Sequence, residues 1–94
     1  MNKYVISSTK VVQGNEEVTR RWFNMSFSSP TEAKAYIHQK FPISKWYALM
    51  PDEIKRGIFS KYIYKRYGEN NSLNTYLIRI HKINLKEDSQ YEET

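Results

Sequence analysis

Cysteine is absent from this chain of 94 residues, and glycine is scarce, with three residues. Without cysteine there is no disulfide framework, no thiolate nucleophile and no cysteine-based zinc site, so the fold has to be held together by packing alone. The three glycines are isolated at Gly14, Gly57 and Gly68, which excludes the glycine-rich phosphate loop of the familiar nucleotide hydrolases. These absences favour an intracellular protein over a secreted, disulfide-rich one.

A long apolar run is also absent from the beginning of the chain. Lys3, Lys10 and several hydroxyl side chains interrupt residues 1–12, and such a segment is too polar for a signal peptide or a membrane span. We therefore expect a cytoplasmic protein with no membrane partner.

Metal-binding and catalytic constellations are missing as well. The two histidines, His38 and His81, are not spaced as a pair of metal ligands, so the sequence predicts neither a metal site nor a cofactor. One enzymatic alternative stays open. His81 lies between Arg79 and Lys82, and an imidazole beside cations could serve general acid–base cleavage of RNA.

Charge is distributed unevenly along the chain. Residues 1–86 carry all fifteen Lys and Arg against six acids, a net charge of +9, whereas residues 87–94 carry four acids and no cation. A basic body of this size attracts polyanions or acidic protein surfaces through a long-range, salt-sensitive field. We predict a single basic domain over residues 1–86, followed by a disordered acidic tail over residues 87–94.

Two strands are predicted at the beginning of the chain. Residues 3–12 are rich in β-branched and hydroxyl side chains, and residues 18–28 alternate apolar and polar positions. The turn signals in residues 13–17 suggest that these strands form an antiparallel hairpin. Phe23, Met25 and Phe27 should face the core, which places Arg20 and Trp22 on the outer face.

Two helices are predicted further along. Ser29, Pro30 and Glu32 form a capping box that starts the first helix, and Pro42 stops it. The second helix is predicted over residues 52–67, because Ile54, Ile58 and Tyr62 recur at helical spacing and Gly68 follows as a C-cap.

Two more segments complete the expected architecture. Residues 43–50 suit a short helix or a strand, with a strand favoured, and residues 73–85 alternate as a last strand. The order is thus β-β-α-(β)-α-β. We predict an α+β fold in which a small antiparallel sheet, made of the N-terminal hairpin, the C-terminal strand and a fourth strand over residues 43–50, carries two helices packed on one face.

Basic residues interleaved with aromatic rings form the candidate site. Cations can bind phosphates, and unpaired bases or flat protein surfaces can stack on Trp and Tyr. The same pattern also occurs on ordinary surfaces, where Lys and Arg solvate a helix face. The candidate residues for binding nucleic acid or a protein partner are Arg20, Arg21, Trp22, Lys55, Arg56, Lys61, Tyr64, Lys65, Arg66, Arg79 and His81.

Two resemblances accompany these residues. In size, charge and the Arg79–His81 pair, the chain resembles the small ribosome-dependent endoribonuclease toxins, although those have a helical hairpin directly after the first strand and a β-hairpin is expected here. As a tiny, cysteine-free chain rich in Lys, Tyr, Asn and Ile, it also resembles accessory proteins of phages and mobile elements, including anti-CRISPR inhibitors.

The leading hypothesis is a non-enzymatic protein whose basic-aromatic surface engages nucleic acid or a nucleic-acid-binding protein complex, as an inhibitor of the anti-CRISPR type would. The alternative is a protein-directed inhibitor or small oligomer that uses Trp and Tyr anchors, with Trp22 and Trp46 as the leading ones. A ribonuclease toxin using His81 and Arg79 is the third hypothesis.

Overall fold

The computed structural model describes residues 2–12, 15–16, 20–68 and 71–84. The expected tail over residues 87–94 and the turn residues 13, 14 and 17 lie outside these ranges. The elements are β1 (Asn2–Val12), β2 (Asn15–Glu16), β3 (Arg21–Phe27), α1 (Pro30–Lys40), β4 (Lys45–Tyr47), α2 (Pro51–Lys55), β5 (Ile58–Tyr67) and β6 (Leu73–Asn84).

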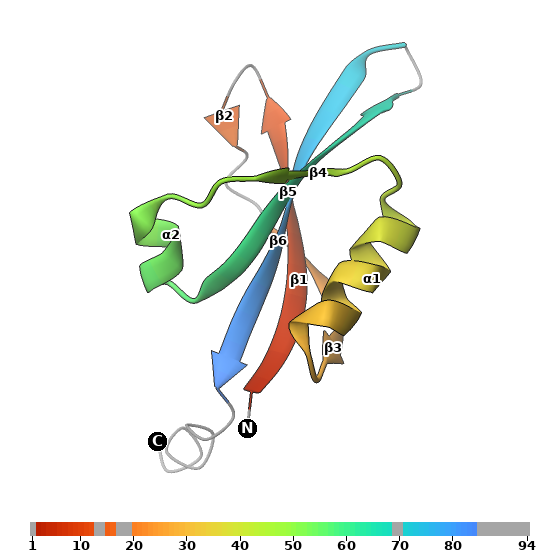
Figure 1. Ribbon diagram of the computed structural model, residues 1–94. Helices are drawn as coiled ribbons and strands as arrows, with labels where there is room; N and C mark the ends of the chain where they lie inside the picture. The colour runs from red at the N-terminus through yellow and green to blue at the C-terminus, as the bar shows by residue number, and fades with distance from the viewer. Residues whose placement is uncertain (1, 13–14, 17–19, 69–70, 85–94) are drawn as a thin grey trace.

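The strands form one antiparallel sheet in the order β2-β1-β6-β5-β4, and β3 also pairs with β1 (Figure 1). The first and last long strands therefore lie side by side, with Asn2 opposite Asn84 and Val11 opposite Thr75. The predicted α+β class, the N-terminal hairpin, the last strand and the strand within residues 43–50 are all confirmed.

One face of the sheet packs against α1, and the apolar core lies between them. Ile6, Ile78 and Ile80 are completely buried there, beside Tyr4 and Tyr62 and under Ala33 and Ile37 of α1. The helix begins as predicted, because the Ser29 side chain accepts a hydrogen bond from the backbone N–H of Glu32 (3.2 Å) and Pro30 occupies the first turn.

The β3 strand departs from the regular alternation expected of it. Val5 pairs with Ser26 but Ser7 pairs with Trp22, so β3 carries extra residues opposite Ile6, as in a β-bulge. Phe23 and Phe27 pack against the core as predicted, whereas Met25 is 45% exposed. The bulge is the physical reason that Met25 leaves the core face.

The predicted helix over residues 52–67 is wrong beyond its first turn. The helix α2 ends at Lys55, Gly57 turns the chain with a positive φ of 85°, and Ile58–Tyr67 forms strand β5 between β6 and β4. Glycine adopts this left-handed conformation without the steric penalty of a Cβ. The observed element order is therefore β-β-β-α-β-α-β-β rather than the expected one.

The two helices contact opposite faces of the sheet, rather than one face as expected. In the pairing of β5 with β6, Lys61 lies opposite Arg79 and Tyr62 lies opposite Ile78. Successive residues of a strand point to opposite faces. Tyr62 belongs to the core under α1, whereas Lys61 and Arg79 both contact Glu53 of α2. We call these two sides the apolar face and the polar face.

Candidate functional site

The eleven candidate residues do not form one surface. By strand alternation and pairing, Arg21, Tyr64 and Arg66 lie on the apolar face, beyond the end of α1, whereas Trp22 and His81 lie on the polar face. The structure brings together two smaller groups. Trp22 is 53% exposed, so it is not sealed inside the protein.

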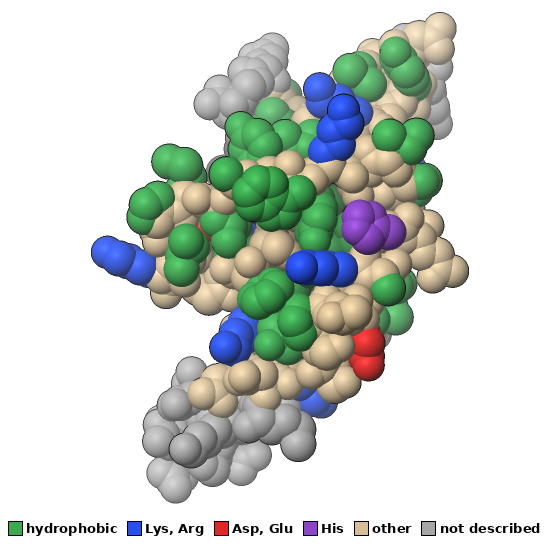
Figure 2. All heavy atoms as spheres, viewed as in Figure 1, with side chains coloured by type: hydrophobic (Ala, Val, Ile, Leu, Met, Phe, Trp, Pro, Cys, Tyr) green, Lys and Arg blue, Asp and Glu red, His purple; other side chains and the backbone are tan. Residues whose placement is uncertain are grey.

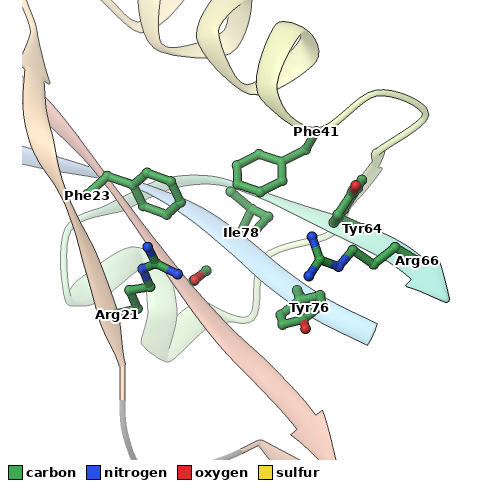
Figure 3. A pocket seen from close by; sticks show the side chains of 8 residues that line it. Arg21, Phe23, Phe41, Tyr64, Arg66, Tyr76 and Ile78 are labelled. Carbon is green, nitrogen blue, oxygen red and sulfur yellow. The ribbon is translucent and has the colours of Figure 1, made fainter. Parts of the chain in front are cut away.

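The first group lines an open cleft of about 120 Å³. Arg21 on β3 and Arg66 on β5 lie on either side, and their side chains extend toward the space above Tyr76 and Ile78 (Figure 3). The remaining lining residues are Ser8, Phe23, Phe41 and Tyr64.

Aromatic rings surround this cleft in a continuous series. The ring of Phe41 contacts those of Phe23 and Tyr64, with centroids 5.6 and 5.0 Å apart, and Tyr64 contacts Tyr76 at 6.4 Å. The series is preorganised because Phe41 sits at the C-terminal end of α1 and the other three rings come from three strands. We call the cleft with its two arginines the arginine-aromatic cleft.

Positive charge dominates the arginine-aromatic cleft. Arg21 lies over the Phe23 ring, with its Cζ atom 5.9 Å from the ring centroid. Among the described residues, no carboxylate forms an ion pair with Arg21 or Arg66. Lys10 pairs with Tyr76 in the neighbouring strand and adds a cation on the same face. The cleft therefore suits a ligand that is both anionic and planar.

The second group is a buried ionic network on the polar face. Glu53 Oε1 accepts a hydrogen bond from Lys61 Nζ (2.8 Å) and Oε2 accepts one from Arg79 Nε (3.1 Å). Arg79 also donates from Nη1 to the Thr9 hydroxyl (3.0 Å), and Glu53 Oε1 accepts from the Met50 backbone N–H (2.8 Å). Lys61 and Arg79 are 4% and 3% exposed, so these two candidates do not present their charges to solvent.

The charge state of Glu53 follows from this environment. Burial by itself raises the pKa of the carboxyl, but the hydrogen bonds from Lys61, Met50 and Arg79 together outweigh it and lower the pKa from 4.5 to about 2. Glu53 is therefore ionised at neutral pH and neutralises one of its two cationic partners.

His81 is also buried on the polar face. Its Nε2 atom is hydrogen-bonded to Ser7 Oγ (2.6 Å), and the Trp22 ring covers it with centroids 4.6 Å apart. Burial and the positive charges of Arg20 and Arg79 lower the pKa of His81 from 6.5 to about 4. A ribonuclease would need this imidazole to reach RNA, whereas here it is buried beneath the Trp22 ring.

The other candidate residues occupy exposed positions. Arg20 lies over the Trp22 ring at 5.6 Å, Arg56 is ion-paired with Asp52 at 2.6 Å, and Lys55 projects from α2. Lys65 lines a separate groove beside β4. The sequence pattern missed Phe23, Phe41 and Tyr76 as site residues because each was expected to serve the core alone or was assigned no role.

Metal and membrane sites receive no support from the described residues. No three His, Cys, Asp or Glu side chains in this part of the chain come together as a group that could hold a metal ion. No helix in the same ranges is long and apolar enough to cross a membrane. Comparisons with protein-family models, with curated proteins and with solved structures gave no significant match.

Proposed function

We propose that this protein is a non-enzymatic binding protein that holds single-stranded nucleic acid in the arginine-aromatic cleft. The observation that carries the proposal is the placement of two arginines, free of carboxylate partners among the described residues, beside a series of four aromatic rings. Guanidinium groups bind phosphate in a bidentate way, and aromatic rings stack on unpaired bases.

The size of the cleft favours a polymer over a small metabolite. Pockets that enclose drug-sized ligands occupy about 300–1,000 Å³, whereas this cleft measures about 120 Å³ and is open to solvent. It can accept a single planar group of a longer ligand. The rest of that ligand would then lie over the basic surface outside the cleft, and the net charge of +5 favours an anionic backbone.

Single strands fit this geometry better than duplexes. In a duplex the bases are stacked on each other and their faces are inaccessible, so the arginines could contact phosphates but the aromatic rings could not stack on bases. The aromatic series would then contribute nothing. The proposal therefore predicts a preference for single strands that depends on the rings as well as on the arginines.

Fluorescence anisotropy with short labelled oligothymidine and oligouridine tests the proposal. The Arg21→Ala/Arg66→Ala variant is expected to weaken binding at least about tenfold and to reduce the magnitude of the salt dependence by about 1.4, since each phosphate contact on a single strand contributes about 0.7. The Tyr76→Ala variant should weaken single-strand binding without changing the salt dependence.

A charge-matched control distinguishes the cleft from general basicity. Arg20→Ala/Lys55→Ala removes the same charge from exposed positions outside the cleft and should change the Kd by less than about threefold. Equal losses in the two double variants would show that only net charge matters. Absence of any binding at low salt would refute the proposal outright.

A further inference from the structure

A second exposed feature lies at the opposite edge of the sheet from β2 and β3, and it shares only Tyr64 with the arginine-aromatic cleft among the described lining residues. The strand β4 is terminal in the sheet order, and no described strand pairs with its outer edge. A groove of about 550 Å³ runs beside it. Its lining residues are Pro42, Ile43, Lys45, Trp46, Tyr47, Ile63, Tyr64 and Lys65, and we call this feature the β4 groove.

Large apolar side chains are unusually exposed along this groove. Ile43 is 89% exposed, Trp46 is 67% exposed and Tyr47 is 49% exposed. Figure 2 shows hydrophobic side chains gathered across the middle of this face, where Figure 1 shows β4 crossing the sheet. Contiguous apolar patches of this kind on soluble domains mark contact sites for partners.

The backbone at Ile43 supports the same conclusion. Its φ of 66° lies in the left-handed region, which is a strained conformation for a β-branched residue. Strain of this kind concentrates at functional sites. Here it occurs at a side chain that makes little contact with its own protein and forms part of the wall of the groove.

Charge around the groove has one sign. The charged side chains that line it are Lys45 and Lys65, and no acid is among those of its lining residues that the structure describes. Lys61 also lies over the Tyr47 ring at 5.0 Å, although its charge is paired with Glu53. An occupant of the groove should therefore carry carboxylates between apolar side chains.

The open edge of β4 adds backbone groups to these features. An unpaired strand edge presents N–H and C=O groups that an extended peptide can pair with, and pockets beside the edge then select alternate side chains. Aliphatic lining from Pro42, Ile43 and Ile63 suits protein side chains better than it suits nucleobases.

We infer that the β4 groove is a docking site for an extended, acidic and apolar segment of a partner protein, which adds to the sheet as a strand next to β4. Apolar side chains of that segment contact Trp46 and Ile43. Its carboxylates pair with Lys45 and Lys65.

A library of random displayed peptides of about nine residues, the length of an ordinary strand, tests the inference on the full chain. Peptides enriched on the wild-type protein are expected to alternate apolar residues with Asp or Glu. Bound to isotope-labelled protein, such a peptide should shift the amide resonances of residues 45–47. Trp46→Ala should weaken it at least about tenfold. Trp46 is largely exposed, so this variant should keep the wild-type Tm.

Two further variants make the result specific. Lys45→Glu/Lys65→Glu should reject the selected peptide and prefer its counterpart with Lys in place of Asp and Glu, because the charge complementarity is reversed. Trp22→Ala changes the other exposed tryptophan, which lies on the polar face, and should leave the peptide affinity within about twofold. Arg21→Ala/Arg66→Ala should also retain peptide binding, which separates this inference from the proposed function.

Several outcomes would overturn the inference. No enrichment over the starting library, enriched peptides without an acidic preference, or binding that survives Trp46→Ala would each do so. Loss of oligothymidine binding in Trp46→Ala, with no peptide bound, would assign the groove to nucleic acid instead.

Discussion

The two faces of the sheet are formed by the same three strands, β1, β6 and β5, but they are stabilised by different chemistry. On the apolar face, Ile6, Ile78 and Ile80 are fully buried against α1. On the polar face, the residues next to them in sequence, Ser7 and Arg79, are just as inaccessible but are hydrogen-bonded. Residues that are equally buried on the two faces should therefore differ in how well they tolerate substitution. Apolar contacts weaken gradually when atoms are removed, whereas a buried polar group fails as soon as its partner is lost.

The largest difference between the faces should appear at Glu53. Glu53→Gln removes the carboxylate charge that pairs with both Lys61 and Arg79, and these two cations remain buried. We expect a loss of about 3–5 kcal/mol in the free energy of unfolding, measured by urea denaturation at pH 7.

A variant without any charge in the network sharpens this comparison. Replacing Glu53, Lys61 and Arg79 together with Met removes all three charges at once, so stability should return to within about 2 kcal/mol of the wild type or exceed it. If the triple variant were less stable than Glu53→Gln, the network would stabilise the folded protein by more than is needed to offset the cost of burying its charges.

The next largest expected effect is a loss of stability as the pH is lowered. The pKa of His81 is lowered in the folded protein to about 4 from an ordinary 6.5, so the unfolded chain binds the proton more tightly. The stability gained by keeping His81 neutral is fully present above about pH 6.5. As the pH falls to 4, this contribution is lost and the free energy of unfolding decreases by about 3 kcal/mol. Thermal unfolding measured across this range should show the decline.

The matched variant is His81→Gln, which does not titrate. Its stability should be nearly flat between pH 6.5 and pH 4.5. Below that, the lowered pKa of Glu53, about 2 compared with 4.5, produces a further loss in both proteins as the carboxyl becomes protonated. An identical decline in the wild type and the variant between pH 6.5 and pH 4.5 would show that His81 is not responsible.

Two serine-to-alanine changes compare the faces directly. Ser7 on the polar face is hydrogen-bonded to His81, and Ser7→Ala should lower the free energy of unfolding by about 1–3 kcal/mol because Nε2 is left unpaired. Ser60 lies opposite Ile80 on the apolar face, and its buried hydroxyl has no hydrogen-bond partner among the described residues. Ser60→Ala should therefore raise stability by about 1 kcal/mol. Changes of the same sign would contradict the contrast between the faces.

The smallest effect lies outside both faces, at the β4 groove. Ile43→Gly relieves the left-handed backbone of an exposed β-branched residue, and we expect the protein to gain about 1 kcal/mol. The same change removes part of the groove wall, so peptide affinity should fall while the Tm rises. A fall in both quantities would mean that Ile43 contributes to packing.

The sequence predicted the strands and the first helix well where the local signals were strong. It failed at residues 58–67 because β5 lies between two strands and its residues 60–62 are buried in succession, on both faces, which removes the alternation of a half-buried strand there. Ile54, Ile58 and Tyr62 then satisfy helical spacing by coincidence. The decisive signal was Gly57, which follows α2 and ends it. Its N–H donates a hydrogen bond to the Ile54 carbonyl, and its carbonyl accepts one from the Lys82 N–H.

The site was predicted less completely than the fold. Arginines next to aromatic residues were visible, but the division between two faces depends on the pairing of β1 with β6, which joins residues far apart in sequence. Lys61 and Arg79 were expected on an open surface. Their partner Glu53 lies on another element, and no local pattern in the sequence indicates such a long-range ion pair.

The pairing of β1 with β6 also has a consequence for synthesis. The central strands of the sheet come from opposite ends of the described chain, and ribosomes release the N-terminal strand first. While translation continues, β1 lacks its main partner, so its apolar residues depend on the β3 hairpin or on chaperones for cover. The sheet can close only once β6 has emerged, so its central pairing cannot form while the segments between β1 and β6 are still being made.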